Sequence, residues 1–286
     1  MGIQSDNLRY RDLKVREGEY VPDVGTDYPE NDPLARLVPA PKVRELVFDD
    51  TYPFIEDTLS FKLQRALAYF LVFGPFYLVN KLKFGVRTEG RKNLFKYRRY
   101  FRNGIVSVSN HCYRWDGMAI AEAMHHRLWI PMLSDHFEGP DWWYLKYFGG
   151  IPLPDGSFGA QKKFNGAFDV HNSRREWIHV FPEARIWNYY KPVRPFMKGA
   201  FTMAYKYNVP VLPIGLIYRE RTGIHKLFAK KEIPLITVKI GEPIFPDVTK
   251  SRKAETDRLL QEAHAAVCKL TGIENNTWPA VWNNEV

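Results

Sequence analysis

A histidine and an aspartate separated by four residues are the side chains of this sequence best suited to chemistry. His111 and Asp116 lie in the segment NHCYRWD, residues 110–116, directly after an apolar stretch at 104–109 that reads as a buried strand. If the loop folds back, the carboxylate can accept the imidazole N–H, fix its tautomer and leave the other ring nitrogen as a general base. Asp116 could instead cap the helix expected at 117–124. The spacing alone leaves both roles open.

A second short motif follows another expected strand. Residues 177–181 read as a strand, and the sequence FPEAR occupies 181–185. Because α/β sheets bind ligands at the carboxyl ends of their strands, this turn is a second candidate part of a site. Two further segments come after it, FMKGA at 196–200 and VPVLP at 209–213.

Expected strands and helices alternate around these motifs. Strands are expected at 104–109, 128–133, 177–181, 209–218 and 233–240. Helices are expected at 117–124, 142–148, 160–175, 197–207 and 252–270. This alternation predicts an α/β fold with a mostly parallel sheet flanked by helices, and we assign residues 85–286 to that domain.

The segment 58–84 in front of the domain has a different character. Residues 66–79 are continuously apolar, interrupted only by the helix-breaking pair Gly74 and Pro75, and lysine and arginine flank them on both sides. The run is shorter than the roughly 18–20 residues that a membrane-spanning helix needs. It is either a buried core helix or an interfacial, membrane-associating helical segment in one leaflet. The basic flanks favour the second interpretation.

Residues 1–57 are polar and rich in proline, with weak periodicity, and are predicted to form an extended arm. The whole chain of 286 residues carries a net charge of +9 and is 45 % hydrophobic, which excludes low-complexity proteins and wholesale disorder. A basic chain fits an anionic membrane surface or a nucleic acid. No helix-turn-helix or base-stacking signature stands out, and the apolar run at 66–79 would be a liability on a soluble DNA-binding protein, so nucleic acid is not expected.

Metal and disulfide chemistry are not expected either. The chain has two cysteines, Cys112 and Cys268, and no CxxC pair. His125, His126 and His136 have no third ligand at a recognisable spacing, and they are interpreted as surface histidines.

Four of these motifs, taken in order, resemble the glycerolipid acyltransferase family, which includes lysophosphatidic acid and glycerol-3-phosphate acyltransferases. They are H-x4-D at 111–116, FPE at 181–183, F-x-KGA at 196–200 and VPV-x-P at 209–213. Residues 86–94 also look like the lead-in to the first motif of that family. The resemblance covers about residues 85–244.

The resemblance implies that His111 is the general base and that Asp116 orients it. The acceptor hydroxyl would lose its proton to His111 while it attacks the thioester of an acyl-CoA or an acyl carrier protein. No covalent acyl-enzyme and no cofactor beyond that co-substrate are then needed. Backbone amides near the 181–185 turn or at the start of the 117–124 helix are the expected donors to the oxyanion.

Two departures from the family pattern leave the acceptor open. The stretch 150–156 contains no arginine, whereas the family has one there that holds a phosphate. Ala184 replaces the usual glycine, and Arg185 comes one position early. Glu183, Arg185 and Lys198 are the candidate acceptor or headgroup residues, with Glu183 expected to pair with a cation or hold an acceptor hydroxyl. Other candidate phosphate-binding cations are Lys162, Lys163, Arg174, Arg175, Lys191 and Arg194.

The sequence therefore predicts a membrane-associated acyltransferase that acts on a lysophospholipid. It would lie on the cytoplasmic face of a membrane as a monotopic or peripheral protein, held by anionic lipid. Two alternatives remain at this point: a thioesterase that uses the same base on water, and a catalytically silent, basic membrane-binding scaffold.

Overall fold

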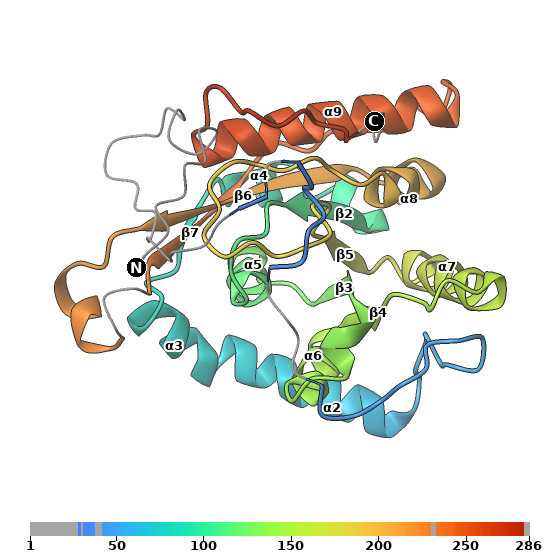
Figure 1. The fold of residues 1–286 in the computed structure, drawn as a ribbon, viewed down its shortest axis with the longest axis horizontal. Helices are drawn as coiled ribbons and strands as arrows, with labels where there is room; N and C mark the ends of the chain where they lie inside the picture. The colour runs from blue at the N-terminus through green and yellow to red at the C-terminus, as the bar shows by residue number, and fades with distance from the viewer. Residues whose placement is uncertain (1–27, 30, 38–41, 230–232, 283–286) are drawn as a thin grey trace.

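A seven-stranded sheet forms the centre of the protein (Figure 1). The computed structural model describes residues 28–29, 31–37, 42–229 and 233–282. The strands are β1 (Arg87–Glu89), β2 (Ile105–Ser109), β3 (Leu128–Met132), β4 (Gly150–Pro152), β5 (Trp177–Val180), β6 (Val211–Arg219) and β7 (Leu235–Ile240), in the order β1-β7-β6-β2-β5-β3-β4. Strands β6, β2, β5, β3 and β4 are mutually parallel. Strand β7 runs antiparallel to β6, and β1 pairs in parallel with β7. The predicted α/β fold with a mostly parallel sheet is confirmed.

Helices cover both faces of the sheet. The α-helices are α2 (Leu59–Phe73), α3 (Pro75–Leu82), α4 (Lys92–Lys96), α5 (Asp116–Met124), α6 (Trp142–Phe148), α7 (Phe158–Ser173), α8 (Gly199–Tyr207) and α9 (Arg252–Thr271). Three short 3-10 helices complete the set, η1 (Tyr100–Asn103), η2 (Ser134–Phe137) and η3 (Gly223–Leu227). Helices α8 and α9 lie on one side of the sheet, and α5 lies on the other with α2 and α3 outside it (Figure 1).

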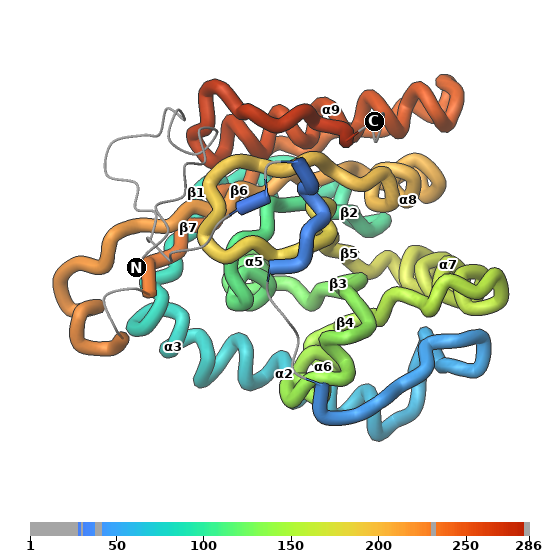
Figure 2. The backbone as a smooth tube through the Cα atoms, viewed as in Figure 1, coloured from blue at the N-terminus to red at the C-terminus, as the bar shows by residue number. Residues whose placement is uncertain are grey.

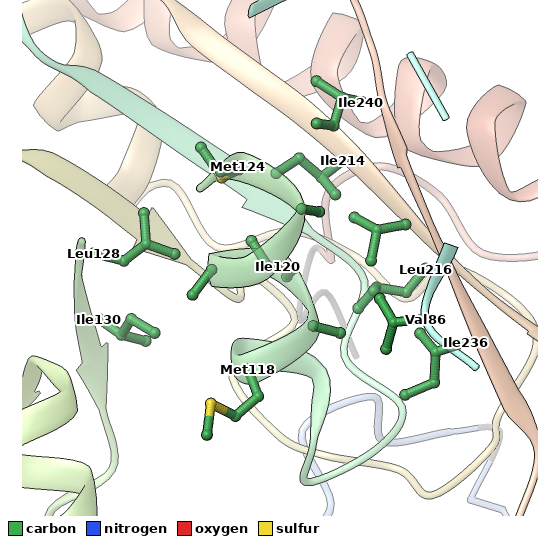
Figure 3. Packing of buried hydrophobic residues seen from close by; sticks show 14 of the residues in the cluster. Val86, Met118, Ile120, Met124, Leu128, Ile130, Ile214, Leu216, Ile236 and Ile240 are labelled. Carbon is green, nitrogen blue, oxygen red and sulfur yellow. The ribbon is translucent and has the colours of Figure 1, made fainter. Parts of the chain in front are cut away.

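The central strands are buried on both faces, which explains their unbroken apolar sequences. Every residue of β2 is buried, as is typical of a parallel strand covered by helices on both sides. Helix α5 packs its apolar residues against β6, β7 and β3, and Figure 3 shows the methionine, isoleucine, leucine and valine side chains that fill this layer. A second cluster lies between the sheet and helices α8 and α9. The two layers fix β2 rigidly at the centre of the molecule.

The apolar segment at 58–84 forms two helices that meet at Gly74. Thr58 caps α2, its side chain accepting from the N–H of Phe61, and Pro75 begins α3 at a position where its missing N–H costs nothing. One face of α2 packs on the domain through buried side chains such as Tyr69 and Val72. The opposite face remains apolar and exposed. Among the described helices, none is long and apolar enough to cross a bilayer.

The N-terminal arm lies against the domain wherever the structure describes it. Of the predicted arm 1–57, residues 1–27, 30 and 38–41 lie outside the described residues; the described ones form neither helix nor strand. Residues 28–29 and 31–37 run beside the loop that precedes α8 (Figure 2). Further along, Phe48 and Phe54 are buried against α7 and its neighbours.

Candidate active site

The pairing of two parallel strands brings the two main motifs together. Val108 of β2 is in register with Val180 of β5. His111 and Glu183 each lie three residues beyond this pair, so both emerge at the carboxyl edge of the sheet. The backbone N–H of His111 donates to Glu183 Oε2 over 3.3 Å. Motifs that are 72 residues apart in the chain therefore form one site.

The loop 111–116 folds around the carboxylate of Asp116. Its Oδ2 accepts from His111 Nδ1 at 3.0 Å and from the backbone N–H groups of Cys112 at 2.9 Å and Tyr113 at 2.8 Å. Asp116 is the first residue of α5, and its carboxylate turns back into the loop instead of capping the helix. Of the two roles left open by the spacing, the structure thus favours the histidine partner.

Two further residues, Tyr218 and Asn110, connect the loop of the His111–Asp116 pair to strand β6. The second carboxylate oxygen, Oδ1, accepts from the hydroxyl of Tyr218 at 2.9 Å. The side chain of Asn110 bonds both the N–H of Leu216, at 2.8 Å, and its carbonyl, at 3.1 Å. Asp116 is fully buried. Both of its carboxylate oxygens are satisfied, one by the three donors of the loop and the other by the hydroxyl of Tyr218. Sequence reasoning missed Tyr218, whose position in an apolar strand gives no functional signal.

The imidazole of His111 is oriented from two directions. Its Nδ1 faces Asp116, and its ring stacks on Phe181 with 3.9 Å between the ring centroids. Because the carboxylate accepts the proton on Nδ1, the neutral ring has Nε2 as its unprotonated nitrogen. His111 also lines a cavity, so its ring is accessible to a molecule bound there.

This cavity has a volume of about 300 Å³, at the lower end of the range for small-molecule sites. Apolar side chains from β3, from α7 and α8, and from the residues that directly follow β3 and β4 form most of its wall; they include Met132, Leu133, Leu153, Phe164, Phe168 and Met203. Beside His111, its polar lining includes Arg36, Asp135, His136 and Arg185. The interpretation of His136 as a surface histidine is therefore wrong. Burial lowers the pKa of His136, and the neighbouring carboxylate of Asp135 opposes that shift.

Glu183 is fully buried and pairs with Arg194, whose Nη2 lies 2.8 Å from Oε2. The backbone N–H of Arg194 also donates to this carboxylate, at 3.2 Å. Burial raises the pKa of the Glu183 carboxyl, and the guanidinium opposes that shift. Arg194, one of the candidate phosphate-binding cations, is itself fully buried and forms part of the framework of the 181–194 turn.

The remaining predicted cations lie in different surroundings. Arg185 lines the cavity, whereas Lys198 does not and pairs with Asp257 at 2.6 Å. Arg174 pairs with Asp57. Lys162, Lys163 and Arg175 are exposed. Among the predicted headgroup residues, Arg185 is the cation that the structure brings to His111.

The turn after β5 also constrains where an oxyanion can be bound. The N–H of Ala184 donates to the carbonyl of Phe181, and that of Arg185 donates to Glu183. These two amides are thus used within the turn. Ala184 has a φ of 63°, a left-handed conformation that favours glycine, which accounts for the glycine expected at this position.

Comparisons with known proteins give one family model and one similar solved structure. A family model described as acyltransferase matches residues 85–217, a segment that contains the His111–Asp116 pair and the turn at 181–185. Among solved structures, the chain is similar to the 1-acyl-sn-glycerophosphate (LPA) acyltransferase PlsC from Thermotoga maritima. That match has 20 % sequence identity and a TM-score of 0.45, and covers 74 % of this chain and 97 % of the other. No curated protein sequence matches significantly.

Proposed function

We propose that this protein, whose residues 85–217 match a family model described as acyltransferase, transfers a fatty acyl group from an acyl thioester to a hydroxyl of a lysophospholipid such as lysophosphatidic acid. The observation that carries the proposal is the short contact between His111 Nδ1 and Asp116 Oδ2 beside a largely apolar cavity. A base held in this way needs no nucleophilic side chain, because the acceptor hydroxyl is the nucleophile.

In the proposed reaction, His111 Nε2 takes the proton of the acceptor hydroxyl as its oxygen attacks the thioester carbonyl. The new C–O bond gives a tetrahedral intermediate, whose collapse breaks the C–S bond. The proton on Nε2 then passes to the leaving thiolate, so the base is regenerated. Asp116 stabilises the imidazolium that forms between these steps, with its charge held by the donors around it.

The cavity supports a substrate that is apolar over most of its length and polar at one end. The apolar wall, built by β3, α7, α8 and Leu153, suits an acyl chain. Arg185 lies at the same cavity as His111 and is the proposed headgroup contact. We assign Glu183 the role of holding this turn in place through Arg194, instead of acting as a second base.

We further propose that α2 and α3 rest in one leaflet of an anionic membrane. On the outer face of α2, Leu63, Leu67 and Phe70 are between 58 and 68 % exposed, an unusual surface for a helix that faces water. Exposed apolar side chains continue along α3 at Tyr77 and Leu78. The net charge of +9 suits the anionic cytoplasmic leaflet, which is the proposed location.

The test is thiol release from palmitoyl-CoA by the purified protein, with and without a panel of lysolipids. We expect release that needs an acceptor and falls by about 100- to 10,000-fold in His111→Ala, because that is the usual contribution of a general base. His126→Ala, at the opposite end of β5 beside Trp177, is the matched control and should keep full activity. Circular dichroism checks that both variants fold.

Three other results would contradict the proposal in different ways. Release without any acceptor identifies a thioesterase. Release that survives in a folded His111→Ala removes the base from the mechanism. If thiol is released neither from palmitoyl-CoA nor from a palmitoylated carrier protein, the remaining alternative is the catalytically silent membrane-binding scaffold.

A further inference from the structure

The arm residue Arg36 lines the same cavity as His111, although 75 positions separate them in the sequence. We propose that Arg36, together with Arg185, binds a phosphate group of a substrate, so that the N-terminal arm forms part of the substrate site. This inference rests on the proposed function, since it assigns a group of that reaction's substrates to these residues.

The arm is fastened to the site by buried partners. The indole N–H of Trp187 donates to the carbonyl of Ala35 at 2.8 Å, and Arg194 Nη1 donates to the carbonyl of Pro33 at 2.8 Å. Trp187 and Arg194 are both fully buried. Because Arg194 also pairs with Glu183, one guanidinium connects the arm to the turn that carries Arg185. The backbone next to Arg36 is therefore held beside the cavity.

Among the described residues that line this end of the cavity, the cations Arg36 and Arg185 accompany one carboxylate, Asp135. Arg36 Nη2 pairs with Asp135 Oδ2 at 2.7 Å. His136 lies among these groups, and burial lowers its pKa, so it is neutral at pH 7. The side chain of Arg36 remains 44 % exposed in spite of its ion pair. A guanidinium presents its N–H donors in a planar fork that matches the oxygens of a phosphate group.

An ion pair between Arg36 and Asp135 could also serve only to hold the arm, and two variants separate that role from phosphate binding. If the pair is only a fastener, Arg36→Gln and Asp135→Asn should weaken the site to a similar extent. If Arg36 binds phosphate, Arg36→Gln removes a ligand, whereas Asp135→Asn removes a competing negative charge. The two variants then have different effects on the binding of an anion.

The experiment measures binding to the full chain by isothermal titration calorimetry. The probes are hexanoyl-lysophosphatidate, hexanoylglycerol as its phosphate-free counterpart, and coenzyme A. We expect Arg36→Gln to weaken the binding of a phosphate probe about tenfold, since a hydrogen bond to a charged group is lost. Hexanoylglycerol should be unaffected. Lys42→Gln, which removes an exposed charge elsewhere in the arm, is the matched control and should bind as the wild type does.

The two phosphate probes distinguish the source of the group. A loss confined to lysophosphatidate assigns the phosphate to the acceptor, and one confined to coenzyme A assigns it to the donor. Asp135→Asn should bind at least as tightly as the wild type. Equal losses in Asp135→Asn and Arg36→Gln, no loss in Arg36→Gln, or no wild-type binding of either phosphate probe would overturn the inference.

Arg36→Lys guards against a trivial folding defect, because it keeps the charge and should bind more tightly than Arg36→Gln. Binding needs no turnover. If the protein binds phosphate through Arg36 but releases no thiol, the proposed function is refuted and this inference stands. If it releases thiol but binds phosphate equally well without Arg36, the proposed function stands and this inference is refuted.

Discussion

At the scale of single residues, the Asp116 carboxylate is the best-determined group of the site. Three donors of its own loop and the hydroxyl of Tyr218 surround it, and none of this requires a substrate. A base that is oriented before the substrate arrives loses little energy to reorganisation during the reaction. In the proposed mechanism, Tyr218 is thus a positioning residue, which acts on His111 through Asp116.

Tyr218→Phe removes one of these donors and keeps the ring. We expect kcat to fall by about tenfold and KM to change little, since one hydrogen bond to a buried carboxylate contributes roughly 1.5–3 kcal/mol. Steady-state kinetics of thiol release measure this split. Tyr205→Phe, which deletes a hydroxyl on α8 that bonds the carbonyl of Lys250, is the matched control. An equal loss in both variants would mean that Tyr218 has only a structural role.

Ala184→Gly tests the backbone of the turn after β5. Because Ala184 has a φ of 63°, glycine should relieve the strain of a left-handed alanine and raise the free energy of unfolding by about 1 kcal/mol. Urea denaturation measures the change. Ala167→Gly, in the middle of α7, should lower the same quantity by about 1 kcal/mol. Destabilisation at both positions would contradict this account of the turn.

At the scale of elements, α2 combines a packed face with an exposed apolar one. Its inner side chains join the core around α5, so the helix is anchored to the domain whatever lies outside it. The interpretation as a core helix holds for the inner face of α2. The interpretation as a membrane interface stays a proposal for the outer face, since a helix that is apolar all round can serve both purposes.

The pair Leu67→Glu and Phe70→Glu tests the interface. We expect the double variant to lose most of its binding to vesicles that contain phosphatidylserine, because two charges would enter the apolar leaflet boundary. Co-sedimentation measures binding. Phe95→Glu is the control, since Phe95 and Phe70 are each 68 % exposed but lie on different helices. Retained binding in the double variant would show that another surface holds the membrane.

Most elements of the fold could be predicted from the sequence, and the exceptions have physical reasons. The expected strands and helices of the domain occur within a few residues of their predicted bounds. Strands β1 and β4 were missed because three residues carry no measurable periodicity. The reversed direction of β7 also went unpredicted, since an apolar run has the same composition in either direction.

The site shows the same division between local and long-range information. His111, Asp116 and Glu183 were found because each lies in a short motif after a strand. The contributions of Tyr218 and Arg36 depend on contacts across 102 and 99 positions, with Asp116 and Asp135 respectively. Pairings of that kind follow from the packing of elements, and no local pattern encodes them.

At the scale of the whole molecule, stability should depend on pH through a histidine in the sheet. His179 of β5 is fully buried, and burial lowers its pKa from 6.5 to about 3. Below about pH 6.5 the unfolded chain therefore binds a proton that the folded chain does not. The contribution of His179 to the free energy of unfolding is therefore fully present above that pH. It is lost as the pH drops towards 3, by at most about 1.4 kcal/mol per pH unit.

His179→Gln should flatten this dependence. Urea denaturation between pH 7.5 and 4.5 gives the change of the free energy of unfolding with pH. We expect this slope to be smaller than in the wild type by the amount that corresponds to uptake of about one proton on unfolding. The slope does not depend on how much the substitution lowers stability overall. His225→Gln, at a half-buried position in η3, is the control for the loss of a histidine outside the sheet. An unchanged slope in His179→Gln would place the proton uptake elsewhere.

The arm also sets an order of events during synthesis. The carbonyls of Ala35 and Pro33 bond partners that follow them by 152 and 161 residues. As the chain leaves the ribosome from its N-terminus, these arm residues emerge long before Trp187 and Arg194 exist. The arm wall of the cavity is therefore translated before its partners and cannot reach its place until most of the sheet has been made.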